Sequence, residues 1–136
     1  MLRKAAFIIA LIAFCAGAGA ASSQSLRDLR AQDADNAALA REASYTSEVC
    51  GRSISARIDW AASRNWPADE SLAAACDGPL GAVEAVCRAG RKNLVRSFVC
   101  AGDGTGPDLS GGVLRYGASP DENGFDVTKA LLDGAG

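Results

Sequence analysis

"VCRAGRKNLVRSFVC", residues 86–100, joins the end of a helical pattern to the beginning of an extended segment, with a cysteine in each part. A helix that begins at Pro79 and ends at Gly90 would carry its apolar residues on one side, namely Leu80, Val83, Val86 and Cys87. Residues 94–100 are instead β-branched and aromatic, which favours a strand. The stretch therefore predicts a helix followed by a strand.

Four cysteines lie beyond the first 20 residues: Cys50, Cys76, Cys87 and Cys100. Structural zinc sites use close pairs of ligands, whereas these cysteines are widely spaced and the chain has no histidine. The C-x-x-C spacing of a thioredoxin-type redox site is also missing. We therefore expect two structural disulfides, no metal site and no cofactor.

The pairing of the cysteines follows from the lengths of the predicted helix and strand. A strand rises about 3.3 Å per residue, so Cys100 lies about 20 Å from the turn at residues 91–93. A helix rises about 1.5 Å per residue, so Cys87 lies about 5 Å back from that turn and Cys76 about 21 Å back. The geometry predicts a Cys76–Cys100 disulfide and, by elimination, Cys50–Cys87.

The rest of the chain completes an α+β layout. Residues from Glu48 to about Ser63 predict a helix, because Cys50, Ile54, Ile58 and Ala61 recur on one face. Pro67 begins a short second helix. Residues 112–117 form a second strand, joined to residues 94–100 by a glycine-rich hairpin link, and Asp126 caps a last helix. The prediction is a small disulfide-stapled domain with three helices, a β-hairpin and a short C-terminal helix.

Residues 1–20 have the pattern of a secretory signal, with Arg3 and Lys4 before an apolar run and small residues up to Ala20. Cleavage after Ala20 would export the protein to a periplasm or out of the cell, with no membrane span left. Residues 21–44 contain leucines that form no sustained stripe, which predicts a flexible or frayed helical arm. Residues 45–136 are the predicted globular domain.

Charge and aromatic residues give the candidate binding surfaces. Of the 14 basic and 16 acidic residues, two basic ones would leave with the signal, and the acidic remainder argues against nucleic-acid binding. A local basic face is formed by Arg88, Arg91, Lys92 and Arg96. These cations either balance a helix C-terminus or bind an anionic envelope ligand or an envelope protein. If Trp60 and Trp66 are exposed rather than buried, they form a sugar-stacking or protein-contact pair.

Catalysis has few candidate groups, because the chain has no histidine and the four cysteines beyond residue 20 are assigned to disulfides. We therefore predict a non-catalytic binding module of the bacterial cell envelope. One alternative is a small cell-wall or glycan hydrolase, in which Glu84 is the acid and a second carboxyl converges on the same cleft. Another is a periplasmic holding chaperone that works through the arm at residues 25–44.

Overall fold

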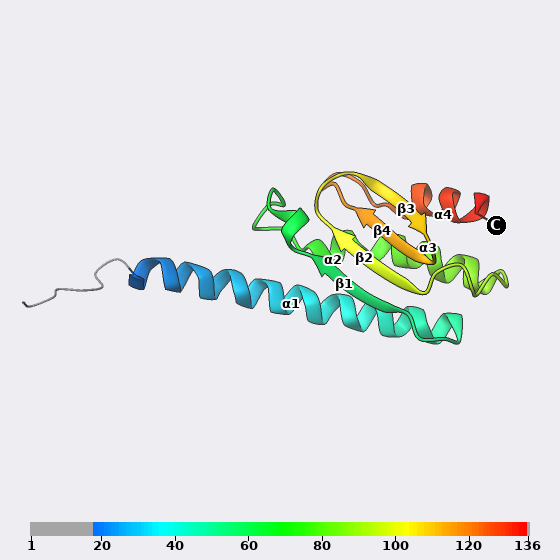
Figure 1. The fold of residues 1–136 in the computed structure, drawn as a ribbon, viewed down its shortest axis with the longest axis horizontal. Helices are drawn as coiled ribbons and strands as arrows, with labels where there is room; N and C mark the ends of the chain where they lie inside the picture. The colour runs from blue at the N-terminus through cyan, green and yellow to red at the C-terminus, as the bar shows by residue number, and fades with distance from the viewer. Residues whose placement is uncertain (1–17, 136) are drawn as a thin grey trace, which may run out of the picture.

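A computed structural model describes residues 18–135, which form a mixed α+β domain as predicted (Figure 1). The predicted signal at residues 1–20 lies outside the described residues, apart from its last three. The helices are α1 (Ala18–Cys50), α2 (Leu72–Ala75), α3 (Asp77–Arg88) and α4 (Phe125–Gly134), with a 3-10 turn, η1 (Ala61–Ser63). The strands are β1 (Ser55–Asp59), β2 (Ser97–Ala101), β3 (Gly106–Ser110) and β4 (Val113–Gly117).

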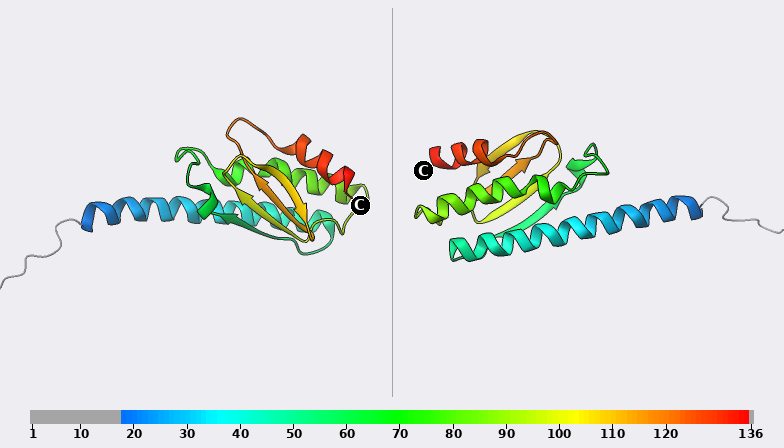
Figure 2. Two further views of the ribbon diagram at one scale, coloured as in Figure 1. Left: turned by 45° about the horizontal axis from the view of Figure 1, so that its top comes forward. Right: turned by 180° about the vertical axis from the view of Figure 1, so that it is seen from behind.

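The four strands form one sheet in the order β1-β2-β4-β3. Strands β1, β2 and β4 are parallel, and β3 pairs with β4 antiparallel. Helices α1, α3 and α4 lie on one face of the sheet (Figure 2). The sheet residues that face them include Phe98, Cys100, Leu114 and Tyr116, each fully buried. Burial of this face stabilises the pairing of β1 with β2, although the two strands are far apart in the sequence.

The predicted helix at residues 48–63 is wrong. Helix α1 ends at Cys50, where Gly51 has φ +68°, and residues 55–59 form strand β1. A spacing of four residues between Ile54 and Ile58 fits strand alternation as well as a helical face, because four is a multiple of two. Both isoleucines are buried and Ala56 between them packs against the same core, as strand alternation requires.

The predicted hairpin between residues 94–100 and 112–117 is also wrong. These segments contain β2 and β4, which are parallel neighbours. The glycine-rich link between them contains strand β3, which reverses direction and forms the hairpin with β4. Proline at position 107 disfavours a strand inside a sheet, because it cannot donate a backbone hydrogen bond. Strand β3 is at the edge of the sheet, where proline is tolerated.

Helix α1 is longer and better packed than the predicted arm. Its buried residues are spaced by four, three and four positions along one face: Leu39, Ala43, Thr46 and Cys50. The predicted boundary at residue 44 therefore falls inside a helix that packs against α3 and β1. Toward its N-terminus the helix extends beyond the sheet, and Leu26 and Leu29 are each 53% exposed (Figure 1).

The two disulfides are Cys50–Cys87 and Cys76–Cys100, the pairs predicted from the spacing. The first joins the end of α1 to α3, and the second joins α2 to the central strand β2. All four cysteines are buried. The predicted second helix is reduced to the four residues of α2, which Ser71 caps by accepting from the Ala74 N–H. The last helix begins at Phe125, one residue before the predicted cap Asp126.

Candidate functional site

The predicted basic face lies at the end of the molecule where α1, α3 and α4 terminate (Figure 1). Arg91 donates to the carbonyl oxygens of Leu132 (2.9 Å), Asp133 (3.2 Å) and Ala135, so it caps the C-terminus of α4. Arg96 donates to the carbonyl oxygen of Gly111. Arg91 therefore caps a helix C-terminus, but that of α4 rather than of the helix that precedes it in the sequence. Arg96 binds the turn between β3 and β4 and no helix end.

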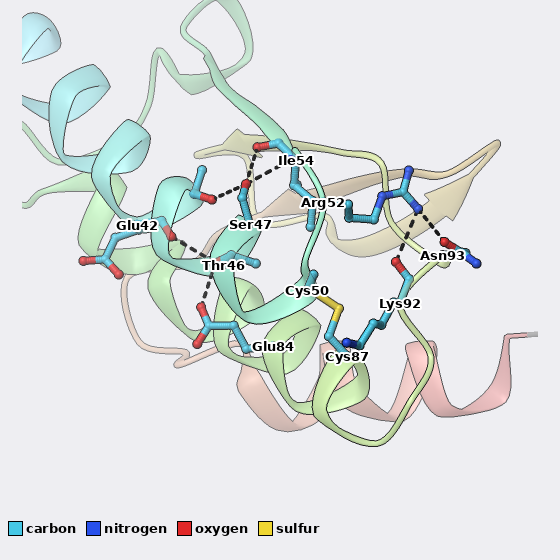
Figure 3. Close-up of a disulfide and its surroundings, with 11 residues drawn as sticks. Glu42, Thr46, Ser47, Cys50, Arg52, Ile54, Glu84, Cys87, Lys92 and Asn93 are labelled. Carbon is cyan, nitrogen blue, oxygen red and sulfur yellow. Dashed lines mark hydrogen bonds between the residues drawn. A yellow bond between two sulfur atoms is a disulfide. The ribbon is translucent and has the colours of Figure 1, made fainter.

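The other two basic residues remain exposed. Arg88 donates to the hydroxyl of Tyr45 over 3.2 Å and does not form the pair with Glu84 that their i,i+4 spacing favours. Lys92 contributes its backbone carbonyl, which accepts from Arg52 over 3.3 Å; Arg52 also donates to Asn93 (Figure 3). The basic face thus contains one helix cap, Arg91, and three exposed cations, Arg88, Lys92 and Arg96.

The two tryptophans flank the short turn that follows β1. Trp60 donates its indole N–H to the Asn36 side chain (3.1 Å), and Trp66 donates to the Glu70 carbonyl (2.9 Å). The turn between them is held by Asp59, which accepts from the Ala62 N–H over 3.1 Å. Both rings are half-buried and fixed at their polar edges, so their orientation is set before any ligand binds.

A groove of about 300 Å³, here called the tryptophan groove, lies between these rings and helix α1. Its polar lining residues include Asp28 and Gln32 from α1 and Arg64 from the turn. Within residues 26–135, none of these three side chains forms a hydrogen bond to another side chain or to the backbone. The full lining is Asp28, Ala31, Gln32, Asp35, Trp60, Ser63, Arg64, Trp66, Pro67, Ala68 and Glu70.

Sequence reasoning singled out Trp60 and Trp66 but missed the α1 side of the groove. Asp28, Gln32 and Asp35 recur at i, i+4 and i+7, which is a polar stripe on one helical face. This polar stripe is the sequence signal from which the α1 side of the groove could have been predicted. Asp35 is already occupied, because it accepts from the Ser71 hydroxyl and from the Leu72 N–H at the start of α2.

A second hollow, here called the edge pocket, lies at the carboxyl ends of the parallel strands. It measures about 290 Å³ and shares Trp66 and Pro67 with the tryptophan groove. Gly102 lies against the Trp66 ring in the wall of the pocket. Glycine is needed at this position, because a Cβ there would stand only 2.9 Å from the ring. Open α/β sheets bind ligands at this edge. The edge pocket is lined by Ala62, Asn65, Trp66, Pro67, Gly102, Asp103, Gly104, Ala118, Ser119 and Pro120.

Asp103 at this edge is held by Arg115. The two side chains form an ion pair at 2.7 Å, and Thr105 also donates to the carboxylate. The hydrogen bond from Arg115 is the main reason why the pKa of Asp103 is lowered, and Thr105 adds to it. Asp103 is therefore a fixed acceptor beside the edge pocket.

The third hollow, here called the acidic pocket, contains Glu84 and measures about 440 Å³. Its lining residues are Glu42, Tyr45, Ala74, Asp77, Gly78, Gly81, Glu84, Asn123 and Phe125. Glu84 is buried and accepts from the Thr46 hydroxyl over 2.7 Å (Figure 3). Glu42, Asp77 and Glu84 therefore line one pocket, and the hydrolase alternative would need a second carboxyl beside Glu84.

No group of three or more metal-ligating side chains in residues 18–135 could hold a metal ion. No helix described there is long and apolar enough to cross a membrane. Comparison of the chain with protein-family models, with curated proteins and with solved structures finds no match. The candidate functional sites are the tryptophan groove, the edge pocket and the acidic pocket.

Proposed function

We propose that this protein is an exported, non-catalytic binding module that holds a saccharide in the tryptophan groove. The observation that carries the proposal is the convergence of both tryptophans on one groove with free polar side chains from two elements. The two disulfides fit an oxidising compartment, which supports export. The pattern of residues 1–20 supports it as well.

The chemistry of the groove matches a sugar ring. A pyranose has faces of C–H groups, which pack on an indole ring, and a rim of hydroxyls, which need hydrogen-bond partners. Asp28 offers acceptors, Arg64 offers donors and Gln32 offers both. A volume of about 300 Å³ is at the lower end of ligand sites, which favours one or two sugar units.

The other predicted functions are supported less well. Binding of an anionic ligand by the basic face stays a prediction, but Arg91 and Arg96 are engaged with backbone carbonyls. The hydrolase alternative makes Glu84 a proton donor, whereas its carboxyl accepts from Thr46. The chaperone alternative would use the arm, most of whose side chains are exposed at residues 26–34.

Intrinsic fluorescence tests the saccharide proposal directly, because Trp60 and Trp66 are the only tryptophans in the chain. Chitobiose, cellobiose and maltose are titrated separately into the oxidised protein. We expect at least one of them to change the emission saturably. Trp66→Ala should weaken that binding at least about tenfold, as loss of an aromatic anchor does.

Two controls make the result specific. Tyr45→Ala removes an exposed aromatic ring that lies outside the groove, and it should leave saccharide affinity unchanged. Calorimetry repeats the titration for Trp66→Ala, in which fluorescence reports on Trp60 alone. If no disaccharide binds at millimolar concentration, or if Trp66→Ala binds as tightly as the parent, the saccharide proposal is wrong.

A further inference from the structure

The acidic pocket combines negative charge with aromatic surface. Its carboxylates are Glu42 from α1 and Asp77 and Glu84 from α3, and its rings are Tyr45 and Phe125. The pocket shares no lining residue with the tryptophan groove, so any role it has is independent of the saccharide proposal. Asp77 has a structural role at the start of α3, where a carboxylate complements the helix dipole. Glu42 and Glu84 have no such role.

Glu84 is the most unusual group in the pocket because it is 9% exposed and lacks a counter-ion. Its Oε2 accepts from Thr46 over 2.7 Å. Among the described residues, no donor bonds to Oε1 and no basic side chain forms an ion pair with either oxygen. A buried carboxylate is costly without a compensating partner. The unpaired oxygen belongs to a residue that lines the pocket, where a ligand could reach it.

The carboxyl groups of the pocket repel one another when they are ionised. The pKa of Glu42 is raised, first by a hydrogen bond and charge repulsion from Asp77, then by burial and by the charge of Glu84. Only Arg41 acts in the opposite direction. Arg88 is near enough to bond the Tyr45 hydroxyl, but it does not line the pocket. A cation that enters the pocket would relieve this repulsion and favour the ionised carboxylates.

An organic cation suits this arrangement better than a metal ion. A metal such as Ca²⁺ needs several oxygens within about 2.6 Å at once, and no group of side chains in residues 18–135 meets that need. An ammonium group accepts longer contacts to several carboxylates, and aromatic rings stabilise it within about 6 Å. The rings of Tyr45 and Phe125 also offer apolar surface for a carbon chain.

We propose that the acidic pocket binds a primary ammonium group carried on a short carbon chain, with Glu84 as its buried counter-ion and Glu42 and Asp77 at its sides. The volume of about 440 Å³ is ample for such a chain and lies within the range of small-molecule sites. The ammonium can come from a free amine or from a lysine side chain.

Two-dimensional NMR of the oxidised protein tests this proposal with defined probes. The first probe is 1,5-diaminopentane, the second is N-acetyl-lysine N-methylamide, and the neutral control is 1,5-pentanediol. We expect at least one amine to shift the amide signals of residues around the pocket saturably, and the diol to shift none. Stronger binding of the lysine derivative identifies a protein as the source, and stronger binding of the diamine identifies a free amine.

Variants show whether the carboxylates carry the recognition. Asp77→Asn and Glu42→Gln alter exposed side chains, and each should weaken amine binding by about tenfold, the size of a lost charge-assisted hydrogen bond. Glu84→Gln should weaken it further. Glu48→Gln is the matched control, because Glu48 is exposed on the same helix but does not line the pocket.

Three results would overturn the proposal. One is the absence of any saturable shift with both amines at millimolar concentration. Another is equal binding of the diol, which would show that charge plays no part. The third is unchanged amine affinity in both Asp77→Asn and Glu42→Gln, since these variants keep the buried Glu84 and should fold.

Discussion

Thr46→Val should destabilise the protein, because it removes the one hydrogen bond that the Glu84 side chain receives from the described residues. Thr46 is fully buried between α1 and α3, and its hydroxyl lies 2.7 Å from Glu84 Oε2 and 3.0 Å from the Glu42 carbonyl. The hydroxyl has one hydrogen for these two acceptors, and the carboxylate oxygen is the nearer. Valine keeps the shape of threonine, so the substitution leaves the packing of α1 on α3 nearly unchanged.

The expected cost is about 1.5 to 3 kcal/mol in the free energy of unfolding, the value of a hydrogen bond to a charged group. Water from the pocket compensates for only part of this loss, because Glu84 is 9% exposed and forms no ion pair among the described residues. A loss of this size raises the unfolding constant by roughly tenfold to a hundredfold.

Urea unfolding followed by circular dichroism measures this cost, and Thr128→Val is the matched control. Thr128 is also fully buried, but its hydroxyl has no partner among the described residues. Thr128→Val should therefore be neutral or slightly stabilising. The reasoning is refuted if the two variants lose the same stability, or if Thr46→Val loses less than about 0.5 kcal/mol.

Three further perturbations probe other parts of the molecule. Replacing Cys76 and Cys100 by alanine should cost about 3 to 4 kcal/mol in urea unfolding, because the disulfide spans a sequence separation of 24. Asp103→Asn should destabilise the protein at neutral pH. The difference in stability between the variant and the parent should shrink as pH falls through the lowered pKa of Asp103. Protonation of Asp103 then removes the ion pair with Arg115 from the parent as well, and urea unfolding at several pH values measures the change. Gly78→Ala should lower the thermal midpoint, with a cost of about 1 to 3 kcal/mol, because the new methyl overlaps a backbone carbonyl.

Local signals predicted those parts of the fold where one interpretation dominated. The proline and glycine at the ends of α3 give its bounds to within about two residues, which is the usual agreement. The cysteine pairing followed from the different rise of helix and strand. The pairing survived the errors elsewhere because the estimate used only residues 76–100, whose helix-then-strand order is right.

The errors arose where the local sequence pattern fitted two structures, or where a tertiary contact determined which structure formed. The spacing of Ile54 and Ile58 fits two periods, and Gly51 rather than the spacing ends the helix. The direction of β4 relative to β2 depends on β3 taking the sheet edge, which no local propensity specifies. Sequence pattern gave no means of placing Leu39 in a core, because the two nearest residues on the same buried stripe are an alanine and a threonine.

The candidate sites show the same division. Trp60 and Trp66 are conspicuous by residue type, but the groove needs α1, which is more than 20 residues away in the sequence. Glu84 was identifiable as a carboxylate inside an apolar helical segment. Its neighbours Glu42 and Asp77 join it only because α1 packs along α3, and the contact Thr46–Glu84 spans 38 residues.

The two disulfides enclose overlapping lengths of chain, Cys50 to Cys87 and Cys76 to Cys100. A single peptide-bond cleavage anywhere between Cys50 and Cys100 leaves both sides joined by at least one bridge. The oxidised protein can therefore be nicked in the turn that carries the tryptophans, or in the loop after α3, without releasing a fragment. Under a pulling force on its ends, the covalent path runs from Cys50 across to Cys87, back along α3 to Cys76, and across to Cys100. Only the chain outside that interlocked region can extend to its full length.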